Sequence, residues 1–302
     1  MHAGLSSQYT FEHFVKIPTF VDVASEFRYK NPLIDNHTLC IFISQSGETA
    51  DTIAALKLAK KAGSKTMAIV NVIGSSITRL ADYTIYTHAG PEVAVASTKA
   101  YTCQVVLLNI LAIYFAEKLG YNCSELESFK NEILALPAKI KSILEDTSSL
   151  KSFAKKVYNQ KDIFFIGRNT DYAVAMEGSL KLKEISYIHS EAYAAGELKH
   201  GPIALIEDGV TVIGIATNPT LVPKTMSNLE EVITRGANVM LVTNQELENK
   251  EFSLSVKIPT CSYLISPILS VVPLQLVSYY IAKEKKLDVD KPRNLAKSVT
   301  VE

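Results

Sequence analysis

A short loop rich in hydroxyl groups is the first place where this sequence could do chemistry. Residues 44–49, SQSGET, follow the apolar run 39–43 and precede a helix-like segment. Where a buried strand passes into a helix, the free N–H groups of the first turn and the helix dipole attract an anion. Ser44, Ser46 and Thr49 add hydroxyl donors, and no lysine is present as in a Walker loop. The loop therefore predicts a site for a compact anion such as a sugar phosphate, with ordinary helix capping as the alternative.

A second hydroxyl pair, Ser97 and Thr98, stands at the start of a long apolar helix-like segment. Capping is again the alternative interpretation, and it is favoured for this pair taken alone.

The segment 173–190 could supply a base. By 3.6-residue periodicity, Glu184 falls on the same helix face as the apolar residues Ala173, Leu180, Tyr187 and Ile188. Burial raises the pKa of a carboxylate on a core-facing stripe unless a cation pairs with it. A raised pKa suits a general base. Lys181 precedes Glu184 by three residues and can reach it. The alternative is a structural ion pair with Lys181, which Glu177 could join.

Two further candidates lie outside the helical pattern. His200 stands between Lys199 and the Gly-Pro pair 201–202, where a regular helix cannot continue, and a loop histidine can move protons near neutral pH. The alternative for His200 is a solvated surface side chain. Lys297 lies in a tail of few large apolar residues, and most tails fray. A lysine held in a desolvated pocket could instead form an imine with a sugar carbonyl.

The elements that must position these residues alternate between strands and helices. The sequence predicts strands at 19–23, 38–43, 65–70, 82–86, 162–166, 210–215, 238–243 and 253–258, and helices at 50–62, 97–118, 172–186, 221–235 and 265–285. Short apolar strands alternating with helices predict an α/β fold with parallel sheets covered on both faces. The charge-free run 258–282 is predicted to be a buried helix with Pro267 in its first turn rather than a membrane span.

An internal repeat predicts two tandem domains. Residues 38–71 match 209–244, with Gly63 and Gly236, and Asn71 and Asn244, each 173 residues apart. The second copy begins with a strand at 162–167, whose counterpart would precede Met1. The first copy is therefore expected to lack its opening strand. The predicted divisions are a first domain at 1–121, a helical connector at 122–158 interrupted by Pro137, a second domain at 159–287 and a tail at 288–302.

Composition excludes several classes of function. Lysine plus arginine equals aspartate plus glutamate, at 31 each, so neither a nucleic-acid partner nor a charged membrane surface is expected. The four cysteines form no CxxC pair and no histidines cluster near them, so no metal site is predicted. No signal peptide is visible, and a reducing, cytoplasmic setting is expected. No cofactor is predicted.

Four segments together carry a resemblance to a known family: SQSGETADT (44–52), AGPEVAVASTKAYT (89–102), LKLKEISYIHSEAYAAGELKHGPIALI (180–206) and KPRNLAKSVTVE (291–302). The chain resembles the isomerase half of the glutamine–fructose-6-phosphate aminotransferases over nearly all its length. The resemblance implies two tandem sugar-isomerase (SIS) domains that bind fructose 6-phosphate. It also implies ammonia from a glutaminase domain, glucosamine 6-phosphate as the product in amino-sugar synthesis, and a homodimer.

The resemblance implies a role for each candidate. Phosphate and sugar contacts would come from Ser44, Gln45, Ser46 and Thr49, and sugar-hydroxyl contacts from Ser97 and the backbone of Val95 and Ala96. Glu184 would move the proton between C1 and C2 beside Lys181, and Lys297 would form the imine. His200 would open the sugar ring from the neighbouring subunit.

The sequence departs from the family pattern in two ways. No glutaminase segment and no Gly-Thr-Ser loop ahead of residue 2 is present, so the chain alone is not expected to hydrolyse glutamine. Two other functions stay open, a non-catalytic sugar-phosphate sensor and an inactive fragment of the synthase. Retention of Glu184, His200 and Lys297 together favours the enzyme, because a sensor needs no such proton or imine chemistry.

Overall fold

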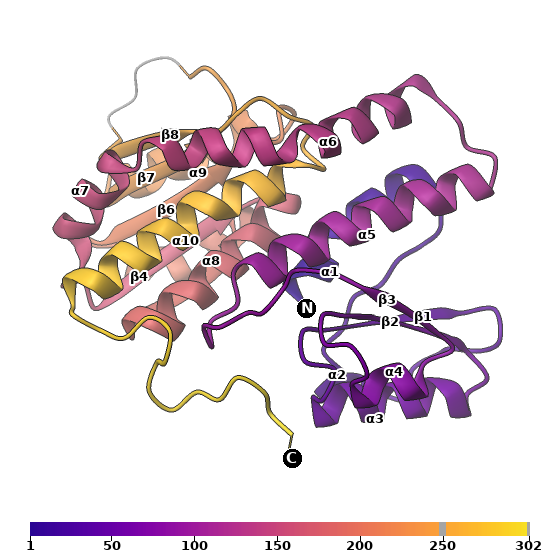
Figure 1. Ribbon diagram of the computed structural model, residues 1–302. Helices are drawn as coiled ribbons and strands as arrows, with labels where there is room; N and C mark the ends of the chain where they lie inside the picture. The colour runs from indigo at the N-terminus through magenta and orange to yellow at the C-terminus, as the bar shows by residue number, and fades with distance from the viewer. Residues whose placement is uncertain (248–251, 301–302) are drawn as a thin grey trace.

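The protein is described by a computed structural model that covers residues 1–247 and 252–300. Figure 1 shows two α/β lobes joined by long helices. The first lobe holds a parallel sheet in the order β1-β2-β3, with bounds Leu39–Ser44, Lys65–Val70 and Tyr83–Tyr86. Helices α2 (Ala24–Phe27), α3 (Ala50–Lys61) and α4 (Ser76–Leu80) belong to this lobe.

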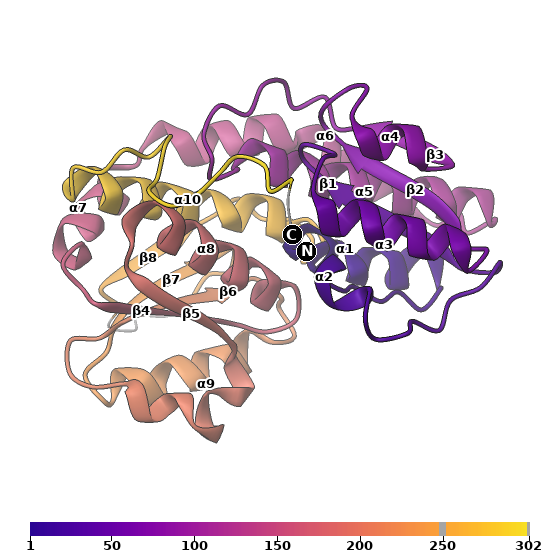
Figure 2. The same ribbon diagram turned by 90° about the horizontal axis from the view of Figure 1, so that it is seen from below.

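The second lobe holds a parallel sheet in the order β5-β4-β6-β7-β8. Its strands are β4 (Asp162–Gly167), β5 (His189–Ala194), β6 (Thr211–Ala216), β7 (Asn238–Thr243) and β8 (Leu254–Lys257). Helices α8 (Thr170–Ser186) and α9 (Val222–Ile233) cover opposite faces of this sheet, as Figure 2 shows. The central strands β6 and β7 are almost wholly buried, which is why they read as continuous apolar runs in the sequence.

Helices between the lobes share one continuous core. They are α1 (His2–Thr10) with the π-helical turn Phe11–Val15, α5 (Lys99–Lys118), α6 (Ser124–Glu145), α7 (Ser148–Val157) and α10 (Ser266–Glu284). Phe14, Val105, Phe129 and Ile268 belong to the same buried cluster as Ile163 of β4. This shared packing fixes the loops of the first sheet relative to α8 of the second lobe.

The α/β class and the tandem arrangement are confirmed, but the strand predicted at 19–23 is wrong. Residues 17–23 have no regular structure, and Phe20 is 91% exposed. Their counterpart in the second lobe, β5, is a strand because β4 supplies its backbone partners. Within the part of the chain that the structure describes, no strand pairs with the outer edge of β1, so residues 17–23 have no neighbour to bond.

The predicted interruption at Pro137 is also wrong. Helix α6 continues through Pro137, and the chain leaves the helical conformation only at Asp146, before α7. Proline removes one backbone hydrogen bond, and the buried residues Leu136 and Ile143 on either side hold the helix against the core.

The charge-free run 258–282 forms the buried helix α10 with Pro267 in its first turn, as predicted. A different helix, α5, is long and apolar enough to cross a membrane by length and composition, and half of its apolar window is buried inside the structure. Such partial burial is common for core helices of globular proteins.

Candidate functional site

The hydroxyl loop forms a tight turn at the carboxyl end of β1. Gly47 has a φ of 72°, and a Cβ there would lie 2.1 Å from Ser75 Oγ, so the position requires glycine. Ser44 Oγ accepts the Gly47 N–H at 2.9 Å, and Ser46 Oγ accepts the Glu48 N–H at 3.2 Å. Thr49 is the N-cap residue of α3, but its side chain makes no capping hydrogen bond. Side-chain capping of α3 by Thr49, the alternative weighed above, is therefore not observed.

Glu48 ties this loop to the next helix. Its carboxylate accepts the Ser76 N–H at the start of α4 at 2.7 Å, and hydrogen bonds from Ser76 lower the pKa of Glu48. Gly47 O accepts the Ile77 N–H at 3.0 Å from the same helix. The turn is thus held by α4 on one side and leads directly into α3 on the other.

The carboxyl-terminal tail crosses from the second lobe to this loop (Figure 1). Ser298 Oγ donates to Ser46 Oγ at 3.1 Å, and Val299 O accepts the Ala50 N–H at 3.4 Å. Nearer its beginning, Asp290 O accepts the Val95 N–H at 3.0 Å. Of the predicted tail 288–302, residues 301 and 302 lie outside the described residues. The tail is therefore ordered against two loops of the first lobe rather than frayed.

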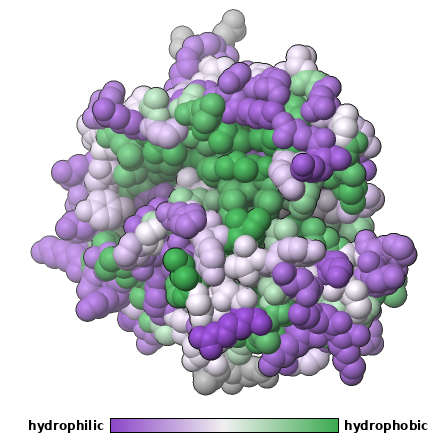
Figure 3. Space-filling model, turned by 45° about the vertical axis from the view of Figure 1, so that its right-hand side comes forward, coloured by the Kyte–Doolittle hydropathy of each residue, from purple (hydrophilic) through white to green (hydrophobic). Residues whose placement is uncertain are grey.

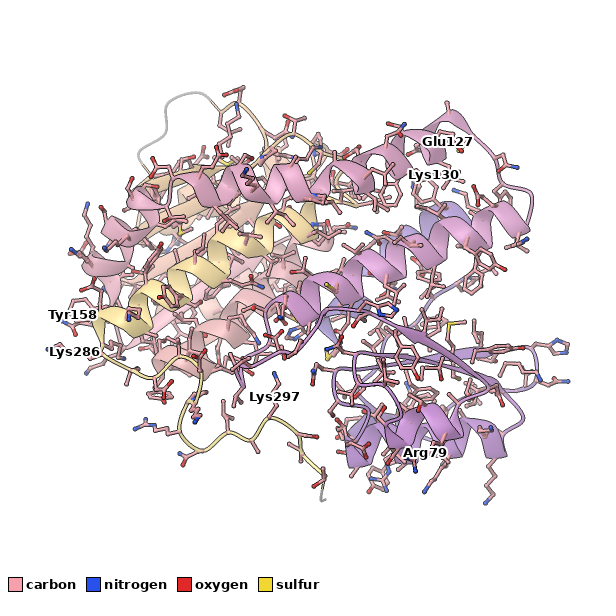
Figure 4. All side chains as sticks on the ribbon, viewed as in Figure 1. Arg79, Glu127, Lys130, Tyr158, Lys286 and Lys297 are labelled. Atoms are coloured by element: carbon pink, nitrogen blue, oxygen red, sulfur yellow. The ribbon has the colours of Figure 1, made fainter. Side chains whose placement is uncertain are left out.

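Lys297 occupies the centre of this contact (Figure 4). Its Nζ donates to Ala94 O and lies 3.4 Å from Ser97 Oγ. Burial lowers the pKa of Lys297, the carboxylate of Glu92 opposes that shift, and the ammonium of Lys181 adds to it. A lysine with a lowered pKa holds more of the neutral amine that attacks carbonyl carbon. The structure brings Lys297 together with the loop 94–97, and the sequence alone did not predict this contact.

Glu184 and Lys181 face the same region from α8. Lys181 Nζ lies 2.6 Å from Glu184 Oε2 and 3.5 Å from Glu177 Oε1. The Lys181 side chain is 5% exposed and that of Glu184 is 21% exposed. Glu184 also acts on the pKa of Lys297, which places the two groups within electrostatic reach. The ion pair anticipated as an alternative is present, and it leaves Glu184 partly open to solvent.

Tyr187 anchors the tail at the end of α8, a role that the sequence did not reveal. It adopts a left-handed conformation at the helix C-cap, with a φ of 61°. The Arg293 guanidinium carbon lies 4.2 Å from the centre of the Tyr187 ring, and the Tyr187 hydroxyl accepts the Arg293 N–H at 2.8 Å. The sequence offers only a weak signal for this contact, a tyrosine near a helix end and an arginine in the tail.

His200 lies on the other face of the second sheet. It ends the short 3₁₀ helix Ala195–His200, which follows β5 and confirms that a regular α-helix does not continue here. Leu198 is buried in the cluster beneath α9, and Lys199 pairs with Glu231 of α9 at 2.6 Å. Because Glu184 is on α8, which covers the opposite face, one chain does not bring His200 to Glu184.

The corresponding loop of the second lobe is already occupied by a carboxylate. Thr217, 173 residues after Ser44, donates its N–H to Asp171 Oδ2 at 2.8 Å and its hydroxyl to Asp171 Oδ1. Asp171 is fully buried, and burial raises its pKa to about 6 despite these hydrogen bonds. In the second copy, the loop that corresponds to the hydroxyl loop is therefore filled from within the chain.

Three comparisons place the chain among known proteins. The SIS domain family model matches residues 1–114 and 156–283. The chain is 59% identical over 304 residues to glutamine–fructose-6-phosphate aminotransferase [isomerizing] of Clostridium tetani and 49% identical over 303 residues to that of Thermococcus kodakarensis. Each alignment covers 100% of this chain and 50% of the relative, so the chain spans about half the length of these relatives.

Solved structures agree. The C-terminal domain of glucosamine-fructose-6-phosphate aminotransferase from Francisella tularensis matches with a TM-score of 0.92 and 37% identity, over 96% of this chain and 84% of that one. Glucosamine-6-phosphate deaminase from Thermotoga maritima matches with a TM-score of 0.77 and 25% identity, over 99% and 86% of the two chains. The chain therefore belongs to the SIS domain family, as a relative of the C-terminal domain of glutamine–fructose-6-phosphate aminotransferases.

Proposed function

We propose that the chain is the sugar-phosphate module of an enzyme that converts fructose 6-phosphate and ammonia into glucosamine 6-phosphate and water. The observation that carries the proposal is the convergence of Lys297, the 44–49 loop, the 94–97 loop and Glu184 through the folded tail. The names of the relatives supply the substrate class and the reaction.

The phosphate is expected to bind at the carboxyl end of β1. The hydroxyls of Ser44, Ser46 and Thr49, the amide of Gln45 and the N–H groups that follow Ala50 in the first turn of α3 form a set of donors suited to a dianion. The backbone of Val95 and Ala96, with Ser97, would contact sugar hydroxyls beside Lys297. This arrangement would set the sugar carbonyl near Lys297, whose pKa burial lowers.

The chemistry then follows from the two side chains nearest the carbonyl. The neutral Lys297 amine adds to C2 of the open-chain sugar and, with loss of water, gives an imine. Ammonia adds to this imine and displaces Lys297, leaving the C2 imine of ammonia. Glu184 removes a proton from C1 and returns it at C2, while O1 loses its proton and the imine nitrogen gains one. The double bond moves, which leaves an aldehyde at C1 and an amine at C2. Lys181 would balance the charge that develops on O1.

The proposal includes a homodimer that shares its active sites. His200, on the opposite face from Glu184, would open the ring in the site of a second copy. Apolar side chains that α5 and α6 leave exposed are Ile110, Tyr114, Leu134 and Leu144. Figure 3 shows hydrophobic residues gathered across the middle of one face, which supports a partner surface. We place the enzyme in the cytoplasm, where free cysteines such as these four stay reduced. A glutaminase is the proposed source of ammonia, because the relatives are named for glutamine.

Borohydride trapping tests the imine. The chain is incubated with fructose 6-phosphate and sodium borohydride, and the labelled lysine is located by peptide mass spectrometry. Lys297 is expected to carry the label, Lys297→Arg to abolish it, and Lys291→Arg in the same tail to leave it unchanged. A label on another lysine would contradict the assignment. Binding without any label or turnover would favour the second candidate, a sugar-phosphate sensor.

A further inference from the structure

A buried ion-pair array extends from Glu184 to the first helix of the chain. Glu177 lies on α8 one turn before Lys181, and only 6% of its side chain is exposed. Its Oε1 lies 3.5 Å from Lys181 Nζ, and its Oε2 accepts a hydrogen bond from His2 Nδ1 at 2.7 Å. Helix α1, which carries His2, packs against both α5 and α8. The order of contacts is His2, Glu177, Lys181 and Glu184.

The array binds the Lys181 ammonium from both sides. Lys181 is 4% exposed, and the two carboxylates lie one turn before it and one turn after it on α8. A buried ammonium needs compensation by charge and hydrogen bonds in a fixed geometry. With Glu184 alone, the flexible lysine chain would be held at one point. Glu177 supplies the second, so the direction of the Lys181–Glu184 contact is fixed.

Tyr101 of α5 lies within electrostatic reach of Glu177. Burial raises the pKa of Tyr101 on α5, and the negative charge of Glu177 adds to that shift. The Tyr101 hydroxyl lies 3.0 Å from Ser6 Oγ of α1 rather than against a carboxylate. Glu177 thus links α1 and α8 and lies close to α5.

We propose that Glu177, held by His2, is a positioning residue that anchors Lys181 and thereby aims the Glu184 carboxylate at the substrate beside Lys297. The inference rests on the proposed function, because Glu184 needs aiming only if it moves a proton. It gives α1, one of the helices between the lobes, a part in positioning the base on α8 of the second lobe.

Kinetics of matched variants test the proposal. Glu177→Gln keeps the shape of the side chain and removes its charge, so kcat for conversion of fructose 6-phosphate to glucose 6-phosphate should fall about 10- to 100-fold, as small misplacements of a catalytic group do. KM and the Kd for fructose 6-phosphate should stay within about twofold, because the phosphate loop is separate. Glu177→Asp should recover part of kcat. Glu127→Gln removes an exposed partner of Lys130 and is the matched control (Figure 4).

The histidine gives an independent arm. His2→Asn retains a donor near the position of Nδ1 and should keep kcat close to that of the parent chain, whereas His2→Ala should lower it. A kcat for Glu177→Gln or His2→Ala equal to that of the control would overturn the proposal. A loss of kcat that Glu177→Asp does not recover, together with weakened sugar binding, would also overturn it and indicate a purely structural role.

An NMR experiment tests the positioning role of Glu177 even where turnover is absent. A buried, doubly anchored ammonium should give a slowly exchanging ¹Hζ–¹⁵Nζ signal, assigned by its loss in Lys181→Met. The signal should broaden or vanish in Glu177→Gln and persist in Glu127→Gln. If the parent chain neither binds nor converts the sugar, the proposed function fails. Persistence of the signal in Glu177→Gln would then refute the positioning role separately.

Discussion

The buried carboxylate of Asp171 should make folding stability depend on pH in a defined window. Its pKa is raised from 3.8 to about 6 in the folded protein, mainly because burial penalises the charged form. Between these two values the folded state binds more protons than the unfolded state, so the free energy of unfolding falls as pH rises. The contribution is complete below about pH 4 and is lost by about pH 6.

The size of the effect follows from the pKa shift. A shift of one unit corresponds to 1.36 kcal/mol, so a rise from 3.8 to about 6 lowers the free energy of unfolding by about 3 kcal/mol across the window. Asp171→Asn should remove this dependence. Its amide oxygen can still accept the Thr217 N–H, and its amide N–H can donate to Thr217 Oγ1, whose hydroxyl then serves Ser266 Oγ.

Urea unfolding of the two proteins at several pH values between 4 and 7.5 provides the assay. Stability of the variant minus that of the parent should rise with pH by about 3 kcal/mol. Asp208→Asn, at an exposed aspartate before β6, is the control and should leave the pH dependence of the parent chain unchanged. Parallel pH curves for the parent and Asp171→Asn would refute the reasoning. They would mean that the carboxylate is ionised at no cost where it lies.

Other outcomes follow from the same geometry. Gly47→Ala places a Cβ 2.1 Å from Ser75 Oγ at a positive φ, so it should lower the free energy of unfolding by at least about 1–2 kcal/mol. It should also weaken fructose 6-phosphate binding, measured by calorimetry, and unchanged affinity would remove the loop from the site. Glu184→Gln should abolish isomerisation while retaining sugar-phosphate binding, and full turnover would exclude it as the base. Mixing His200→Asn with Glu184→Gln subunits should restore about a quarter of the parent activity, because half of random dimers hold one complete site; no restoration would contradict sharing between subunits.

The sequence by itself determined the α/β class and the duplication. Strands such as 65–70 and 238–243 are visible locally because a parallel strand buried on both faces needs an unbroken apolar run. The sequence also identified the hydroxyl loop and Glu184 as candidate site residues, because residue spacing alone predicts where a strand ends and which side chains share a helix face. The strand at 19–23 failed because a strand exists only with a partner, and that partner is not a local property.

Only the tertiary structure decided how the candidates meet. Lys297 contacts Ala94, 203 residues earlier in the chain, because Tyr187 and the first-lobe loops bind the tail. His200 falls on the α9 side of its sheet through the path that follows β5, so it cannot serve the Glu184 of its own chain. Asp171 fills the second loop because the start of α8 packs against the end of β6, where Thr217 follows. Such contacts depend on packing between distant segments, which residue spacing does not encode.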